Sequence, residues 1–514
     1  MQDLDRTKQP ALAIGGFGLA GLLLLAPLMS TAAHPGMFFD GIVYATIARN
    51  MAVGDGDCWH PHWERGSSNQ WYEAPTGAIW LESLCFRVAG DHAWVEKIYS
   101  VLTRLATAAL MVLIWRSLVP RDSATFDQGW LSVAIWALVP ALPSAYANNL
   151  LENTLGVFAA ASVYCSIRAM RSERRTLIWI AAAAAALLGA VLAKGPVGLF
   201  PLVTPLLLGM TVTSSARRKS LTLTCLLATA FLLLFGLVLL QPAAREYLVH
   251  YFQTQVIASV RGQRELVASH LGRAYILSHL AHQLTHPLIF AAALVGLGRL
   301  GAGNWFRARP SGSPSDSPAR LEQVATAGPV VGFLLLTAMS ASLPIMISQK
   351  QWGHYAIPSF PFFALALAAW CAPSMTAIAK SLRSVNVFEL WSLAPLTAAA
   401  AVLIGVSGPA TQQSEADGYH DAQAIVRALP PHSVVGFWPP EQIDFLLYAN
   451  LARWSDARVS QNAADHEFRI LPVGSRLPPD GYCPVAAELR RWQLCRRDSI
   501  PEKAERPIRG NLRD

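Results

Sequence analysis

The sequence predicts an α-helical polytopic membrane protein, and three observations lead to this fold class. Hydrophobic residues fill 53% of the 514 positions, charged residues fill only 14%, and the mean hydropathy is +0.34. A soluble chain of this length carries a larger charged surface. Apolar runs of about 20 residues, the length that crosses a bilayer, recur along the chain. Within lipid such runs must form helices, because each backbone polar group has to find its partner inside the segment.

The apolar runs predict about eleven transmembrane helices. We place them at 11–32, 99–119, 128–146, 150–167, 177–194, 197–213, 221–240, 285–301, 326–347, 355–373 and 388–407. The first run ends in STAA, which resembles a signal-peptidase site. Asp3 and Asp5 before it and the many later spans favour a first helix that is retained.

Positive charge is concentrated in short loops between these helices. The formal net charge is +8, and basic residues cluster at 168–175, 215–220, 307–320 and 380–383. A cytoplasmic N-terminus places all of these loops inside, as the positive-inside rule requires. Membrane topology therefore explains the charge, and since the sequence contains no nucleic-acid-binding motif we expect no nucleic acid partner.

An odd number of spans places the C-terminal region on the outer side. We therefore expect a transmembrane domain over 1–408, with long outer loops at 33–98 and 241–285, and a small outer α/β domain over 409–514.

The C-terminal segment is polar and charged, unlike the rest of the chain. Strand-like runs at 433–438 and 468–474 and a helical pattern at 441–454 predict its α/β fold. Cys483 and Cys495 lie on the expected oxidising side, so they form either a disulfide or two free thiols.

Three acidic residues lie at the predicted outer face, and each has a simple structural explanation. Asp40 can cap the helix that follows it, and Glu73 stands just before a helix start. Glu152 opens the fourth span, where a carboxylate is favoured by the positive helix end. Ionisable groups at the edge of a membrane are nevertheless candidates for function.

Basic residues lie in two outer turns on the same side. Lys194 belongs to the turn LAKGPVGLFP. Its simple structural explanation is a snorkelling lysine, whose aliphatic stem lies along apolar surface while the ammonium group reaches water. Lys350 and His354 belong to SQKQWGHYAIPSFPF, between the ninth and tenth spans. The agreement of these acids and cations on one membrane face predicts a common site.

Five segments resemble motifs of one family, in the same order along the chain. They are FFDGIVYATIARNM, YEAPTGAIWLESL, LENTLGVFAAAS, LAKGPVGLFP and HYAIPSFPFFALALA. The chain resembles integral-membrane glycosyltransferases of the GT-C fold, in particular the bacterial aminoarabinose transferases of lipid A and the protein O-mannosyltransferases. The resemblance covers roughly residues 10–375. Ala74 departs from the pattern, because the aminoarabinose enzymes have a lysine there that is thought to meet the lipid phosphate.

The resemblance implies a reaction at the periplasmic face of the bacterial inner membrane. A hexosyl or pentosyl group would pass from a polyprenyl-phosphate carrier to a hydroxyl or similar acceptor on a glycolipid, polysaccharide or protein. Asp40 would act as general base towards the acceptor, with inversion at the anomeric carbon. Glu152 would orient the acceptor or stabilise an oxocarbenium-like transition state.

The phosphate leaving group needs positive charge more than it needs a proton. Ordinary loop charge is the competing explanation for many of the candidates. The residues that we expect to bind phosphate or substrate are Tyr44, Lys194, Arg261, Arg264, Arg273, Lys350, His354 and Tyr355.

The resemblance also implies a divalent metal ion. Relatives hold one near the first-loop glutamate and a histidine of the second outer loop, which here correspond to Glu73 and His270. Such ligands suit zinc or a similar ion. No complete ligand set is evident in the sequence, so the metal stays open.

Two other function classes compete with this interpretation. A transporter or flippase of lipid-linked saccharides should show inverted repeats and broken helices with charge near the membrane centre. The sequence shows no internal repeat, and its ionisable groups gather at one face, which favours the enzyme. A catalytically inactive scaffold is suggested by Ala74, but the presence of all three acids favours an active enzyme.

Overall fold

The computed structural model contains two compact units. It describes residues 15–26, 36–64, 70–213, 217–264, 271–307, 317–381, 410–439, 443–455, 458–460, 466–475, 481–485 and 488–497. The first unit comprises Met1–Ala33, Ile47–His62 and Ser68–Gly408. The second comprises His34–Thr46, Trp63–Ser67 and Pro409–Asp514, so it joins part of the loop predicted at 33–98 to the C-terminal segment.

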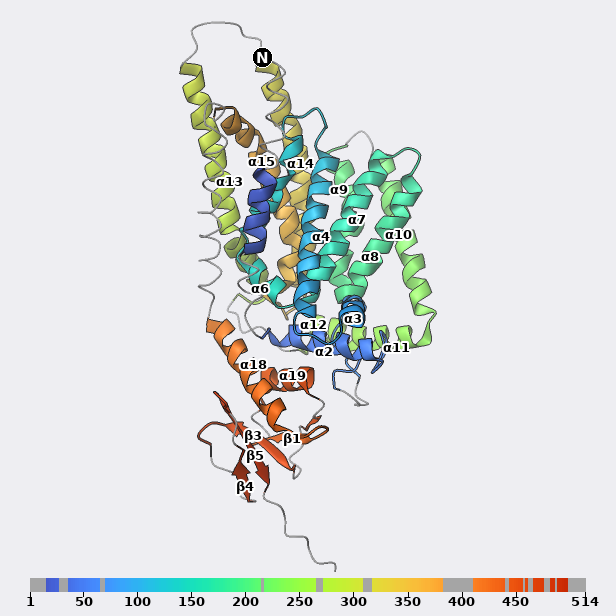
Figure 1. Ribbon diagram of the computed structural model, residues 1–514. Coiled ribbons are helices and arrows are strands. Elements are labelled where there is room, and N and C mark those ends of the chain that lie inside the picture. The colour runs from blue at the N-terminus through green and yellow to red at the C-terminus, as the bar shows by residue number, and fades with distance from the viewer. Residues whose placement is uncertain are drawn as a thin grey trace, which may run out of the picture. The chain divides into compact units, whose positions relative to one another are not determined.

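The first unit is built from helices, of which α4, α7, α8 and α10 lie side by side, with α11 across one end of this group (Figure 1). Its described α-helices include a short apolar helix at Gly15–Ala26, inside the expected first span, and α3 (Gly77–Ala89), α4 (Val95–Leu118), α5 (Gly129–Ala137), α6 (Ala141–Ala147), α7 (Leu151–Arg171), α8 (Thr176–Lys194), α9 (Thr204–Thr211), α10 (Arg217–Leu239), α11 (Pro242–Tyr251), α12 (Ala258–Val260), α13 (Tyr275–Arg307), α14 (Ser317–Ser342) and α15 (Phe360–Ser381). Shorter turns of other helix types are η1 (Phe126–Gln128), η2 (Gly195–Val203), η4 (Phe252–Ile257), η5 (Gly272–Ala274), η7 (Leu343–Ile347) and η8 (Gly353–Ser359).

The described residues contain 6 helices long and apolar enough to cross a membrane, or up to 7 if a bent pair counts as one span. They are Val95–Leu118, Thr176–Thr211, Arg217–Leu239, Gly272–Arg299, Gly328–Ile347 and Gly353–Ala379. The multi-span fold is thereby confirmed, but the expected number of eleven is not. The expected span at 388–407 lies outside the described residues, and the one at 128–146 is the bent pair.

The bent pair consists of Phe126–Ala137 and Ala141–Ala147, which meet at 85°. A helix break at membrane depth leaves backbone groups that need new partners. Here the backbone N–H of Ala141 donates to Gln283 Oε1 of α13 at 2.7 Å. The fully buried Arg104 of α4 packs over an aromatic ring on each side of the break, Trp136 and Tyr146, at 5.8 and 5.4 Å from the ring centroids.

Gly195 ends α8 and turns the chain into η2. Its φ of 82° and ψ of −150° belong to a region that only glycine occupies without strain. A Cβ at Gly195 would also collide with the Tyr251 hydroxyl, and one at Gly198 would lie 2.6 Å from the carbonyl of Ala190. The KGP turn of the sequence therefore folds η2 tightly against α8 and fixes Lys194 at the last position of α8.

The second unit contains a five-stranded mixed sheet with two helices (Figure 1). The strand order is β2-β1-β3-β5-β4, with β1 parallel to both β2 and β3 and β5 antiparallel to β3 and β4. The predicted small α/β region is thus confirmed. Its elements are α18 (Ala410–Ala428), β1 (Val434–Phe437), α19 (Phe445–Trp454), β2 (Arg458–Ser460), β3 (Phe468–Pro472), β4 (Tyr482–Pro484) and β5 (Trp492–Arg497).

The helix α2 (Phe39–Val53) begins two residues earlier than the sequence suggested. Asp40 therefore lies inside the first turn instead of capping the helix from outside. In this position its carboxylate still faces the positive end of the helix dipole, which stabilises it.

Cys483 and Cys495 are both free thiols in the structure. Cys483 pairs with Arg496 across the antiparallel strands, and Cys495 pairs with Pro484. Because neighbouring residues of a strand point to opposite faces, this register places the two thiols on opposite faces of the sheet. Accordingly Cys495 is buried and Cys483 is exposed, and the disulfide is not formed.

We expect Gly195→Ala to destabilise the protein by about 1–3 kcal/mol, the usual strain of a residue forced into a glycine-only conformation. Thermal unfolding in detergent measures this. The matched control is Gly236→Ala in α10, where a Cβ would meet nothing within 4 Å. An unchanged melting temperature for Gly195→Ala would contradict the assigned turn.

Candidate active site

A buried carboxylate, Glu152, is the centre of the candidate site in the first unit. It lies in the first turn of α7 and is 1% exposed. Lys194 Nζ at the end of α8 lies 2.5 Å from Glu152 Oε1, and His354 Nε2 of η8 lies 3.6 Å from the same oxygen. The Lys194 ammonium also lies 5.0 Å from the ring centroid of Tyr355. Four residues that the sequence singled out, from three distant segments, are therefore brought together.

The Glu152 carboxylate is held by charge more than by hydrogen-bond geometry. Among the described residues neither of its oxygens has a hydrogen bond of regular angle, although Lys194 is at ion-pair distance. The short distance to Lys194 supplies the compensating charge that a buried carboxylate needs. The carboxylate thus keeps lone pairs available for a hydroxyl donor.

Polar contacts fix the start of α7 against α4. Asn153 Nδ2 donates to Ser100 Oγ at 3.1 Å and to the carbonyl of Ala145 at 3.0 Å. The hydroxyls of Tyr99 and Thr154 are 2.8 Å apart. Buried polar groups that hydrogen-bond to one another have one preferred arrangement, so these contacts hold the first turn of α7 in place. The Glu152 side chain on that turn is thereby oriented.

The turn before α7 is fixed in the same manner. Asn149 adopts a left-handed φ of 51°, and its Nδ2 donates to the buried Glu82 Oε1 of α3 at 2.8 Å. Lys97 Nζ donates to the carbonyl of Ala147 at 2.9 Å, which satisfies the last turn of α6. Sequence reasoning missed Asn149, although Asn-Asn before a helix is a typical signal for this conformation.

The helix α11 contacts the site through two buried tyrosines. The Tyr251 hydroxyl lies 3.4 Å from the carbonyl of Lys194. Burial raises the pKa of Tyr251, while the nearby positive charge of Arg264 opposes this. The Tyr247 hydroxyl contacts the carbonyls of Trp71 and Ala74 at 3.0 and 2.7 Å. In consequence α11 connects Lys194 to the loop around Glu73.

Gln351 connects the late loop to the start of α13. It is fully buried. Its Nε2 donates to the carbonyls of Arg273 and Ser348 at 2.9 and 3.0 Å, and its Oε1 accepts from the N–H of Ile276 at 3.1 Å. Gln351 thereby fixes the loop that carries His354. Sequence reasoning missed Gln351, because a single glutamine gives no signal of burial.

The remaining cations are Lys350 in this same loop and three arginines between α12 and α13. Arg261 and Arg273 are exposed, whereas Arg264 and Lys350 are partly buried. Lys350 acts electrostatically on His354, together with Lys194. Arg264 and Lys350 therefore interact electrostatically with Tyr251 and His354 of the site, whereas Arg261 and Arg273 lie on the surface.

Only one member of the predicted metal pair lies among the described residues. Glu73 is exposed in the loop before α3, and His270 lies outside the described residues. The part of the chain that the structure describes contains no group of three or more His, Cys, Asp or Glu side chains that could hold a metal ion. The metal therefore stays a prediction of the resemblance. Asp40 and Tyr44 belong to α2 within the second unit.

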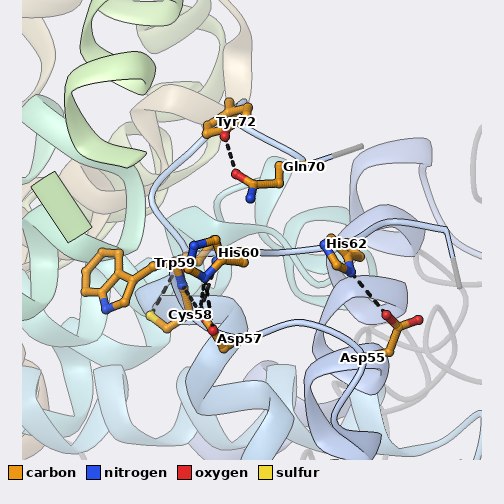
Figure 2. A network of polar contacts seen from close by, with 9 residues as sticks. Asp55, Asp57, Cys58, Trp59, His60, His62, Gln70 and Tyr72 are labelled. Carbon is orange, nitrogen blue, oxygen red and sulfur yellow. Dashed lines mark hydrogen bonds and ion pairs between the residues drawn. The ribbon is translucent and has the colours of Figure 1, made fainter. Parts of the chain in front are cut away.

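The loop predicted at 33–98 contains a polar network that sequence reasoning did not find (Figure 2). Asp57 accepts from the N–H groups of Trp59 and His60 at 2.7 and 3.0 Å, and the His60 ring lies 3.1 Å from the same carboxylate. Burial alone would raise the pKa of Asp57, but these hydrogen bonds outweigh it and lower the pKa. His62 pairs with Asp55 at 3.1 Å. The network is a local turn that shapes the loop.

We expect Lys194→Met to lower stability by about 3–5 kcal/mol, because it leaves Glu152 buried without its countercharge. Thermal unfolding in detergent measures the loss. The double variant Glu152→Gln/Lys194→Met should recover most of it, since the buried charge is then gone. Equal melting temperatures for the single and double variants would mean that the ion pair is not what holds this site together.

Comparison with known proteins supports the same fold. Residues 73–242 match the family model described as dolichyl-phosphate-mannose-protein mannosyltransferase. No curated protein sequence matches the chain. The crystal structure of ArnT from Cupriavidus metallidurans bound to undecaprenyl phosphate superposes with a TM-score of 0.60 at 14% identity, covering 93% of this chain and 97% of that one. The apo form of the same protein gives 0.62 at 13% identity, with 96% and 98% covered.

At such identity a structural likeness shows the fold alone. The family model adds a sequence match that includes Glu73, Glu152 and Lys194. Together they confirm the resemblance derived from the motifs: the chain is a multi-span membrane protein with the fold of the GT-C glycosyltransferases.

Proposed function

We propose that the protein transfers a sugar from a polyprenyl-phosphate carrier to a hydroxyl of an acceptor at the periplasmic face of the inner membrane. The observation that carries this proposal is the buried Glu152 carboxylate in contact with Lys194 and His354. The similar ArnT structure, which was solved with undecaprenyl phosphate, supports a carrier of this class. With the basic loops on the cytoplasmic side, the N-terminus is cytoplasmic and the C-terminal domain is periplasmic.

The cations of the site suit a phosphate leaving group. Lys194 lies at the centre, and Lys350 is close enough to act electrostatically on His354 beside it. Arg264 acts on Tyr251, whose hydroxyl contacts the backbone of Lys194. Positive charges held in place before the reaction stabilise the charge that develops on the departing phosphate. Arg261 and Arg273, being exposed, are better suited to attract the anionic carrier than to contact it in the transition state.

In the proposed reaction, Asp40 takes the proton of the acceptor hydroxyl as its oxygen attacks the anomeric carbon. The new bond forms as the bond from this carbon to the phosphate oxygen breaks, and the electron pair leaves with the polyprenyl phosphate. A single displacement inverts the anomeric configuration. Glu152 stabilises the positive charge on the sugar ring or orients the acceptor, because its carboxylate is fixed by α7 and its neighbours.

The sugar and the acceptor are left open by this site. Ala74 stands where the aminoarabinose enzymes have a lysine, so the chain lacks one cation of that pattern. A glycolipid, a polysaccharide and a protein hydroxyl all fit the proposed chemistry. Mass spectrometry of lipid-linked sugars and envelope glycans in a deletion strain identifies both partners, because the unused donor accumulates and one modification disappears.

A transporter or flippase of lipid-linked saccharides is the second candidate, and one observation favours it. The α5–α6 pair is broken by 85° and lies beside the fully buried Arg104, as in transporters that bind substrates at a helix break. However, Arg104 is occupied by two aromatic rings, whereas the Glu152 site combines a carboxylate with cations. Purified protein that moves the carrier across vesicles without forming product would favour this candidate.

We expect Asp40→Asn to insert and fold normally but to lose transfer by about two to four orders of magnitude, the usual contribution of a general base. The assay follows a radiolabelled polyprenyl-phosphate sugar into acceptor with purified protein. Size-exclusion chromatography and thermal unfolding check the fold. Wild-type turnover in this variant would remove Asp40 from the mechanism.

A further inference from the structure

The hydrophobic core of the C-terminal domain is completed by a residue of the first outer loop. Trp63 packs against the core cluster that includes Leu447, Tyr448 and Leu451 of α19. Its ring centroid lies 4.8 Å from that of Tyr448. Aromatic pairs at this distance stabilise an interface beyond the area that they bury. The C-terminal domain and this part of the loop thus fold as one body.

The same contact continues to the residue next to Asp40. Phe39 meets Trp63 edge to face at 6.0 Å and Phe445 of α19 at 6.2 Å. We call the four rings of Phe39, Trp63, Phe445 and Tyr448 the aromatic clamp. Because Phe39 and Asp40 share the first turn of α2, the clamp fixes the helix turn that carries the proposed base.

Two polar features hold the clamp itself. The Tyr448 hydroxyl donates to the carboxylate of Glu64, a residue 384 positions earlier in the sequence. Asp444 caps α19 by accepting from the N–H groups of Leu446 and Leu447 at 2.8 and 3.1 Å. The ring-bearing face of α19 is therefore fixed at its N-terminal end.

The backbone ahead of α2 approaches the other helix of the domain. Gly36 adopts a φ of 89°, and a Cβ there would lie 2.6 Å from the carbonyl oxygen of Glu415 in α18. Only glycine fits at this position, because the backbone of α18 comes too close for any Cβ. Both α18 and α19 thus hold the segment that leads into Asp40.

We infer that the C-terminal domain is a positioning element of the reaction, acting through the aromatic clamp on Asp40. The inference rests on the proposed function, since it assigns the domain a part in base catalysis. A general base must be placed within a few tenths of an ångström of its target, and a misplacement of about 1 Å can cost 10²-fold in rate. Tyr448, Phe445 and Trp63 are positioning residues in this sense, because they act through Asp40.

The test compares two buried tyrosines of the same domain. Tyr448→Phe removes the hydroxyl bond to Glu64, whereas Tyr482→Phe removes a hydroxyl bond from β4 to the carbonyl of His466, just before β3. We expect Tyr448→Phe to lower kcat about tenfold or more with KM for the lipid donor unchanged, and Tyr482→Phe to leave kcat at the wild-type value. Phe445→Ala should act as Tyr448→Phe does. Equal kcat values for Tyr448→Phe and Tyr482→Phe would overturn the inference.

A double variant tests whether the clamp acts through Asp40. Asp40→Asn/Tyr448→Phe should be no slower than Asp40→Asn, since the clamp then has no base to position. Multiplying losses would overturn the inference, because they would show that Tyr448 acts by another route. A fully active Asp40→Asn variant would instead refute the assigned base, which separates failure of the proposed function from failure of the clamp.

Cross-linking tests the contact without any activity assay. In Glu64→Cys/Tyr448→Cys a short bis-maleimide reagent should join the two thiols in most molecules, because the side chains that they replace touch only at their tips, which leaves the thiols too far apart for a direct disulfide. Peptide mass spectrometry detects the cross-link. Failure to cross-link in folded protein would overturn the inference.

Discussion

The pairing of Glu152 with Lys194 is the interaction on which the rest of the candidate site depends. A carboxylate with 1% exposure beside the membrane is costly unless a cation neutralises it, and Lys194 is 2.5 Å away. Several unrelated features meet this one requirement. The glycine-only turn fixes the end of α8, the contacts of Asn153 fix the start of α7, and Gln351 fixes the loop that brings His354. The site is therefore a property of the whole helix arrangement and not of one motif.

Much of this could be predicted from the sequence. Apolar runs reveal membrane helices because lipid allows no other backbone solution, and the strands at 434–437 and 468–472 fall inside the predicted runs. Glu152, Lys194, His354 and Tyr355 could be grouped from their common membrane face and from the family motifs, and the structure brings these four together. Charges are rare at such positions, which makes each of them informative.

Other features could not be predicted, for physical reasons. The number of spans depends on bends such as the 85° break beside Arg104, which hydropathy does not register. Asn149 and Gln351 act through tertiary hydrogen bonds, and a polar residue looks alike in sequence whether it is buried or exposed. The spacing of Cys483 and Cys495 permitted a disulfide, but strand register decides which face each thiol occupies.

The position of Trp63 in the core of the C-terminal domain has a consequence for biogenesis. The two partners Glu64 and Tyr448 are separated by 384 residues, so the early loop is synthesised long before the helix that receives it. Until translation of the late helix is complete, Trp63 lacks the residues of α19 against which it packs, and afterwards it lies against the core of the domain. Maturation of the domain therefore requires that the loop around Trp63 and the C-terminal segment have reached the same side of the bilayer. A molecule in which one of these two segments is on the wrong side would expose an incomplete apolar core, which is the kind of surface that cellular quality control recognises.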